Sequence, residues 1–333
     1  MIFAADRIKG ELTGILNMKK TILLWIGFLS IPINGKAQFM PYDTLPLTLD
    51  YITCLAADSG GTVYATDLGN ICRSTDNGDH WTACASVPSD IATLNYAPDS
   101  SLIVTRVNRT SHLGDVWRSR DSGKSWKFIL DDYAEDIQFD HNGGIYLGMV
   151  YSTNDGNSWS LAATSKLRGV PYVTALSPSG ALITCTDSGI GNANIGLYRS
   201  TNKGSSWLMS GLYYKNGSLA HIPDKRFCKF VSTEKDMYLS DHYGGCLYKS
   251  TDDGISFEAI AVGPVFMEEV FAATNNSNLY ISRDSSLYCS MDGGNNWRLL
   301  AQFPENITVF AVSSDLVFIG TERKNSIYRL RIK

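Results

Sequence analysis

The sequence predicts an all-β fold in which four-stranded sheets follow one another around a ring. An eight-residue pattern, SxDxGxxW, occurs six times in the 333 residues. Its successive serines are separated by 45, 33, 48, 50 and 40 residues, which suits a unit of four short strands better than a helical repeat. Alternating apolar runs bounded by Gly, Asp and Asn lie between the copies. Together these observations predict a seven-bladed β-propeller, with six blades as the alternative.

Each copy of the pattern predicts a turn between two antiparallel strands. The Asp or Asn side chain can accept hydrogen bonds from turn amides, the Gly can adopt a positive φ, and the aromatic residue can cover the turn. The third position of the six copies is held by Asp76, Asp121, Asn154, Asn202, Asp252 and Asp292. The closing aromatic residues are Trp81, Trp126, Trp159, Trp207, Phe257 and Trp297. We expect a structural role for all twelve residues.

The pattern resembles the Asp-box, or BNR (bacterial neuraminidase) repeat, found in β-propellers of the sialidase superfamily. The resemblance implies that the boxes lie on the face opposite any active site. The turns could instead be calcium loops, which in the helix-loop-helix case need a Glu at the twelfth position. Counting from the four turn Asp residues, Asp76, Asp121, Asp252 and Asp292, gives Val87, Asp132, Gly263 and Phe303, and none of these is Glu. We therefore favour turns over metal sites.

The N-terminal part predicts a cleavable export signal. Lys19 and Lys20 precede an almost wholly apolar run over residues 21–33, and Gly35 and Ala37 have the small side chains of a cleavage site. A run of this length is too short for a permanent membrane span. We expect a signal peptide at Met18–Ala37, an upstream extension before it, and one domain over residues 38–333. The expected location is periplasmic or extracellular.

The seventh blade is predicted to contain both ends of the exported chain. Three strands without an eight-residue pattern are expected at 307–312, 316–320 and 326–330. Tyr42 lies ten residues before Ile52, as Trp297 lies ten residues before Ile307. The segment 39–49 therefore has the register of an outer strand and would close the ring.

Composition excludes some functions. Residues 38–333 contain 24 Lys and Arg against 31 Asp and Glu, a net charge of −7 without a basic stripe, so nucleic acid is a poor partner.

The seven Cys include no CxxC and no Cys/His cluster, so we expect no zinc site and no cofactor. Cys72 and Cys84 flank the first turn, and a disulfide between them remains open beside two buried thiols. We expect a monomer.

Ligand-binding residues are expected on the face opposite the six turns. That face carries the loops from second to third strands and the links between blades. The candidates are Arg106, Arg109, His112, Asp132, Glu135, Asp136, Tyr213, Tyr214, Asp241, His242, Tyr243, Arg283 and Arg323.

The resemblance implies three functions. Photosystem-assembly-factor-like and sortilin-like propellers present the ring to a protein, peptide or glycan, and we favour such a binding module. Exo-sialidases grip a carboxylate with three arginines, for which Arg106, Arg283 and Arg323 could converge, but their opening Arg-Ile-Pro segment is absent. Xyloglucanase-type enzymes use two propellers in tandem, and Asp132, Glu135 and Asp136 could supply an acid and a base.

Overall fold

The computed structural model describes residues 40–47, 49, 51–58, 60–67, 69–85, 87, 90–107, 114–131, 137–140, 142–163, 167, 170–187, 196–220, 228–241, 246–262, 271–273, 278–322 and 327–332. For 170–173, 187, 228, 241, 261–262 and 271–273 it describes the backbone alone. The chain divides into two compact units, Met1–Gly35 and Lys36–Lys333, and every described residue belongs to the second. Among these residues there is no helix of the length and apolarity that crossing a membrane requires.

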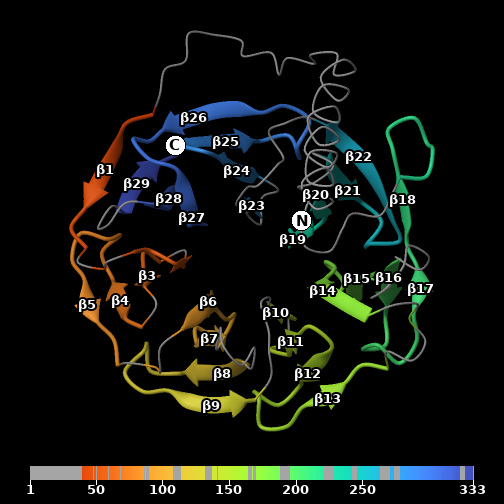
Figure 1. Ribbon diagram of the computed structural model, residues 1–333, viewed down its shortest axis with the longest axis horizontal. Coiled ribbons are helices and arrows are strands. Elements are labelled where there is room, and N and C mark those ends of the chain that lie inside the picture. Colours follow the sequence, from red (N-terminus) through yellow and green to blue (C-terminus); the bar gives the residue numbers. More distant parts are fainter. Residues whose placement is uncertain are drawn as a thin grey trace, which may run out of the picture. The chain divides into compact units, whose positions relative to one another are not determined.

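Seven sheets, each with four antiparallel strands and one with an added fifth strand, form the ring of a seven-bladed β-propeller, which confirms the predicted fold (Figure 1). We name them blades A to G and give the strands of each from the inside outward. Blade A contains β2 (Cys54–Ala57), β3 (Val63–Thr66), β4 (Ile71–Ser74) and β5 (Thr82–Ala83). Blade B contains β6 (Ile91–Tyr96), β7 (Leu102–Val107), β8 (Gly114–Ser119) and β9 (Lys127–Leu130). Blade C contains β10 (Ile137–Phe139), β11 (Ile145–Leu147), β12 (Val150–Ser152) and β13 (Ser160–Leu161).

The remaining blades follow the same order. Blade D contains β14 (Val170–Leu176), β15 (Leu182–Asp187), β16 (Leu197–Ser200) and β17 (Leu208–Met209). Blade E contains β19 (Cys228–Ser232), β20 (Met237–Asp241), β21 (Cys246–Ser250) and β22 (Ser256–Val262), with β18 (Gly211–Tyr213) outside them. Blade F contains β23 (Phe271–Ala273), β24 (Leu279–Arg283), β25 (Ser286–Ser290) and β26 (Arg298–Gln302). Blade G contains β27 (Ile307–Val312), β28 (Leu316–Thr321), β29 (Ile327–Arg331) and β1 (Tyr42–Leu45).

The ring is closed by the N-terminal strand, as the sequence predicts. β1 pairs antiparallel with β29, and Tyr42 lies opposite Leu330. The Tyr42 ring packs against Phe303 and Tyr328, with centroids 4.7 and 5.2 Å away. The Met40 amide also donates to the Leu300 carbonyl of blade F at 2.9 Å. β1 therefore supplies both a fourth strand and an aromatic residue to blade G.

All six turns have one geometry. In the second copy, the Ser119 hydroxyl donates to Asp121 and accepts the Gly123 amide, both at 2.8 Å, and Asp121 accepts the Ser125 amide at 2.9 Å. Ser122 and Gly123 both have positive φ, 62° and 85°. Asn154 makes the same contacts, accepting from Ser152 at 3.0 Å, so an Asn at this position preserves the turn.

Three of the closing tryptophans join their turns to the preceding blade by a hydrogen bond, whereas the indole N–H of Trp297 donates to Gly294 of its own turn at 3.0 Å. The indole N–H of Trp126 donates to the Ala85 carbonyl at 3.0 Å, that of Trp159 to Ile129 at 2.9 Å, and that of Trp207 to Ala163 at 3.1 Å. Phe257, which has no such donor, is fully buried between blades D and E. The closing aromatic residues thus pack at the junctions between neighbouring blades.

The structure overturns the disulfide hypothesis for the first turn. Cys72 lies opposite Ala83 in the β4–β5 pair, so Cys84 follows on the other face of the sheet. Cys72 packs in the cluster between blades G and A, and Cys84 packs in the cluster between A and B. Both are free thiols, and burial raises the pKa of Cys84 to about 11.

Candidate functional site

The strand order separates the ring into two faces with different contents. The six turns share one face with the hairpins between first and second strands, and the Asn77 amide of the first turn donates to the Gly61 carbonyl of such a hairpin at 3.0 Å. We call this the turn face. The loops between second and third strands and the links between blades lie on the other, which we call the loop face.

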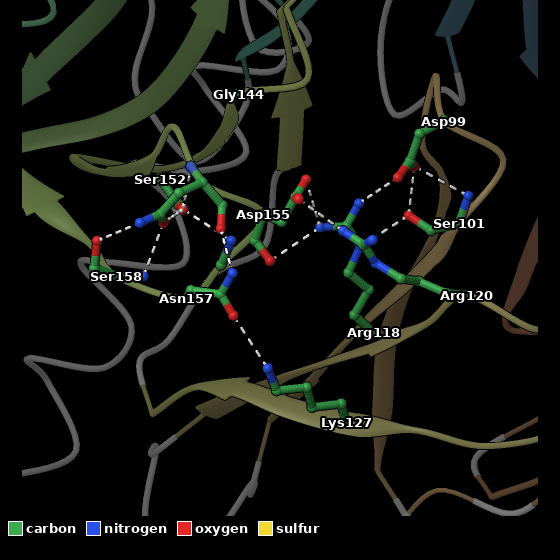
Figure 2. A network of polar contacts seen from close by, with 12 residues as sticks. Asp99, Ser101, Arg118, Arg120, Lys127, Gly144, Ser152, Asp155, Asn157 and Ser158 are labelled. Carbon is green, nitrogen blue, oxygen red and sulfur yellow. Dashed lines mark hydrogen bonds and ion pairs between the residues drawn. The ribbon is translucent and has the colours of Figure 1, made fainter.

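Polar side chains of the turn face hold neighbouring blades together. Arg118, which is 5% exposed, donates to the Ser101 hydroxyl at 3.0 Å and to Asp99 at 2.6 Å within blade B. It also donates to the Asp155 carbonyl in the turn of blade C at 3.0 Å. Figure 2 shows this contact beside two ion pairs to the Asp155 carboxylate, one from Arg118 at 3.5 Å and one from Arg120 at 2.9 Å.

The same contact recurs around the ring. Arg199 of blade D donates to the Asp253 carbonyl of blade E at 2.7 Å and forms an ion pair with its carboxylate. Although burial opposes ionisation of Asp253, hydrogen bonds from Ser179 and other partners hold its pKa below the usual range. Arg118 and Arg199 both directly precede a turn serine, and both join their blade to the turn of the next blade.

The carboxylates of the turn aspartates accept hydrogen bonds from residues of their own turns. Hydrogen bonds from the Ser125 hydroxyl and amide lower the pKa of Asp121 to about 2. Hydrogen bonds from the His80 amide and ring lower the pKa of Asp76, and Asp76 in turn raises the pKa of His80. Within the described part of the chain, no three His, Cys, Asp or Glu side chains are grouped as metal ligands would be.

Four predicted ligand-binding residues have described side chains, and a fifth has a described backbone. Arg106, Arg283 and Asp241 lie at the loop-face ends of second strands in blades B, F and E. Tyr213 and Tyr214 lie elsewhere, on the outer edge of blade E. The other predicted residues, namely Arg109, His112, Asp132, Glu135, Asp136, His242, Tyr243 and Arg323, lie outside the described residues.

Arg106 belongs to a fixed polar group. Its guanidinium donates to the Asp115 carboxylate at 2.8 Å, and the other carboxylate oxygen accepts the Trp117 indole N–H at 2.8 Å. The two charged side chains are only 17% and 24% exposed. Asp115 therefore offsets the charge of Arg106, which weakens its suitability as one of three arginines gripping a carboxylate.

Arg283 lies in the most completely described sector of the loop face. It is 41% exposed, with its Nε 3.8 Å from the carboxylate of Asp284. The Asp284 carbonyl accepts the Ile307 amide at 2.7 Å, which fixes this β24–β25 turn against the start of β27. Arg283 is therefore held beside the link between blades F and G.

Three further polar residues lie in this sector, and none of them is among the thirteen predicted ligand-binding residues. The Glu305 carboxylate accepts the buried Tyr328 hydroxyl at 3.1 Å. The Asn306 side-chain amide donates to the exposed Glu322 carboxylate at 3.2 Å, and the Glu322 amide donates to the Asn306 carbonyl at 3.0 Å. The loop face thus brings Glu305, Asn306 and Glu322 together with Arg283, although they come from separate connections.

The two predicted tyrosines belong to an unpredicted hairpin. β18 pairs parallel with β22, and Tyr213 lies opposite Glu258. The chain then turns at 214–218, where the Tyr214 backbone carbonyl accepts the Gly217 amide and the Tyr214 backbone amide donates to the Ser218 carbonyl, both at 2.8 Å. Figure 1 shows β18 on the outside of blade E, away from the inner strands.

No protein-family model matches the chain. A curated xyloglucanase of Hypocrea jecorina is 28% identical over 287 residues, which cover 79% of this chain and 31% of that protein. The chain thus spans about a third of the length of this curated relative.

Solved structures show the same fold at low identity. A structure of YCF48 bound to a D1 peptide is 17% identical, covers 89% of this chain and 97% of its own, and has a TM-score of 0.56. Virginiamycin B lyase from Staphylococcus aureus is 14% identical, covers 88% of this chain and 100% of its own, and has a TM-score of 0.64. These likenesses concern the fold alone.

Proposed function

We propose that this protein is an exported β-propeller of the Asp-box type that binds a protein or a glycan at its loop face, as a recognition or assembly module. The observation that carries the proposal is that polar side chains have different roles on the two faces of the ring. The serines, carboxylates and arginines described on the turn face form contacts within and between blades. The loop face presents exposed polar side chains, among them Asp284, Asn306 and Glu322.

One comparison supports a binding role. The chain shares its ring over most of its length with YCF48, a protein whose structure holds a D1 peptide. The export proposal rests on the predicted signal peptide at Met18–Ala37. A loop face on a rigid ring suits recognition because the scaffold holds loop side chains in place.

The binding face can be tested with charge-reversal variants. Labelled protein is applied to a peptide array and a glycan array, and the bound members are identified. We expect Asp284→Arg and Glu322→Arg to change the set or strength of bound members, whereas Lys124→Glu, at an exposed position in a turn, leaves them unchanged. Binding that responds to Lys124→Glu and ignores both loop-face variants contradicts the proposal.

A glycoside hydrolase is the second candidate, because the xyloglucanase relative covers most of this chain. The candidate acids and bases are Asp132, Glu135 and Asp136. The test is hydrolysis of fluorogenic glycosides that include a sialoside and a xyloglucan oligosaccharide. Turnover that disappears in Glu135→Gln supports this candidate, and turnover lost in Arg283→Ala supports the sialidase variant. The absence of turnover on every glycoside leaves the binding module.

A further inference from the structure

Two of the blade junctions on the turn face pair an arginine with an acidic residue at two fixed positions. The arginine directly precedes a turn serine, and the acidic residue is the fourth residue of the turn in the next blade. Arg118 pairs with Asp155 in this way, and Arg199 pairs with Asp253. Each guanidinium also donates to the backbone carbonyl of the same acidic residue, at 3.0 and 2.7 Å. The two positions therefore form one recurring contact between blades.

The junction between blades A and B has the arginine of this contact without the acidic residue. Arg73 holds the first position, and Ser122 holds the second. The Cζ atom of Arg73 lies 5.9 Å from the centre of the Tyr64 ring. Its Nε is buried and has no hydrogen-bond partner, and Arg73 takes part in none of the ion pairs between described residues. Because a guanidinium keeps its charge, this junction holds a partly buried cation without a counter-ion in the described chain.

Ser122 reaches the same corner from the next blade. Burial raises the pKa of Tyr64, whereas a hydrogen bond with the Ser122 side chain and the charge of Arg73 act in the opposite direction. Arg73 and Ser122 thus both lie beside Tyr64. The Ser122 carbonyl accepts the Cys84 thiol at 3.8 Å, and a Cβ on Gly123 would lie 2.7 Å from the Cys84 sulfur. Because the packing is this close, we expect room for a single small ion rather than for a polyatomic one.

The other polar residues of the turn face do not replace the acidic residue. Asp58, in the hairpin between β2 and β3, accepts two amides of its own hairpin at 2.8 Å and the Tyr96 hydroxyl at 3.2 Å. No ion pair between described residues joins Asp58 to Arg73. The turn-face connections are described except for Ser59, His141 and 274–277, and none of these is Asp or Glu. A counter-ion for Arg73 is therefore expected to come from the solvent.

We propose that the junction between blades A and B binds a chloride ion between the Arg73 guanidinium and the Ser122 hydroxyl. A buried donor without a protein partner is a place where an ion or a water binds, and the charge of Arg73 favours an anion. The ion takes the part that the carboxylates of Asp155 and Asp253 have at their junctions, and it joins blade A to blade B. The site lies on the turn face, so the inference goes beyond the proposed recognition function and does not depend on it.

Melting temperatures of the full-length protein, measured in sodium chloride and in sodium gluconate at equal ionic strength, test the proposal. At a concentration of ten times its Kd, chloride should raise the melting temperature by about 2 °C over gluconate. Arg73→Gln should abolish this difference. Arg120→Gln, which removes the same charge from a 59% exposed side chain of this face, should retain it. Equal melting temperatures of the unmodified protein in the two salts would overturn the proposal.

Ser122→Asp supplies the carboxylate within the chain. Asp155 and Asp253 show that Asp fits this turn position, because their φ values of 66° and 63° match the 62° of Ser122. The new carboxylate should pair with Arg73, raise the melting temperature in gluconate and remove the response to chloride. A Ser122→Asp protein that responds to chloride as strongly as the unmodified protein contradicts the site.

Anomalous diffraction from crystals soaked in bromide locates the ion directly. A bromide peak in contact with the Arg73 guanidinium supports the site, and the absence of a peak there overturns it. Stabilisation by phosphate or acetate without stabilisation by chloride overturns the choice of a halide. The peptide and glycan arrays test the loop face separately, so a failure of this site and a failure of the recognition function give different results.

Discussion

Arg329, in the third strand of the last blade, donates a hydrogen bond to the carbonyl oxygen of Asn77, in the turn of the first blade, at 2.9 Å. The same guanidinium forms ion pairs with Asp79 at 2.8 Å and with Asp43 of β1 at 3.0 Å. One side chain therefore connects the C-terminal strand, the N-terminal strand and blade A at the point where the ring closes.

Arg329→Ala should destabilise the ring by about 1–3 kcal/mol, because it removes charge-assisted hydrogen bonds from a side chain that is only 18% exposed. Urea unfolding measures the change. Arg331→Ala is the control, because Arg331 is 67% exposed and pairs only with Asp315 among the ion pairs described for it. A surface pair of this kind contributes less than about 1 kcal/mol. Equal losses in the two variants would disprove the closing role of Arg329.

Tyr42→Ala should cost about 2–3 kcal/mol, because the ring packs against Phe303 and Tyr328 at the closure. Thr44→Ala, at an exposed position of the same strand, should change the free energy of unfolding far less. Deletion of 39–49 should lower the melting temperature further, since β29 then loses the outer of its two paired strands. A deletion variant that melts like the unmodified protein refutes closure by β1.

Gly254→Ala should destabilise the protein more than Gly217→Ala. Both glycines have positive φ, 83° and 78°, so both substitutions carry a similar backbone cost of about 1 kcal/mol. A Cβ at Gly254 would lie 2.4 Å from the Ile183 side chain, whereas one at Gly217 meets no atom within 4 Å. Overpacking adds about 1–3 kcal/mol at Gly254. Denaturant titration of both variants isolates the packing contribution, and equal effects contradict it.

Asp121→Asn should make the protein less sensitive to acid. The pKa of Asp121 is about 2 in the folded protein and about 4 in an unfolded chain. The unfolded state therefore binds the proton first as pH falls, and the stabilisation present above about pH 4 is lost towards pH 2. An Asn has no such titration and keeps the turn, as Asn154 shows.

Melting temperatures between pH 2 and pH 7 measure this effect. The decrease on acidification should be smaller in Asp121→Asn than in the unmodified protein. The reciprocal variant Asn154→Asp should show a larger decrease, because it adds an ionisable group to an equivalent turn. Parallel pH curves for all three proteins would show that the turn carboxylates do not contribute to acid sensitivity.

The fold could be predicted from the sequence because its determinants are local and repeated. The six turns depend on contacts within eight residues, such as that between Ser119 and Asp121, and the spacing of Tyr42 from Ile52 reproduces that of Trp297 from Ile307. The strand β18 could not be predicted, because three residues that pair parallel with β22 carry no local pattern. The disulfide hypothesis was based on the spacing of the two cysteines around the turn. Strand alternation places Cys72 and Cys84 on opposite faces of the blade A sheet, so the hypothesis was wrong.

The candidate site was less accessible from the sequence, because its residues come together only through the ring. Glu305 and Glu322 look like ordinary loop charges until Tyr328 and Asn306 are placed beside them.

The pairing of β1 with β29 also orders events during synthesis. Tyr42 and Leu330 are neighbours in the sheet, yet blades A to F lie between them in the sequence. The ribosome makes β1 before these blades and its partner β29 after them, so the blades can assemble while the first strand is still unpaired. In a chain that is truncated before β29, β1 has no strand to pair with. Its exposed strand edge then favours aggregation.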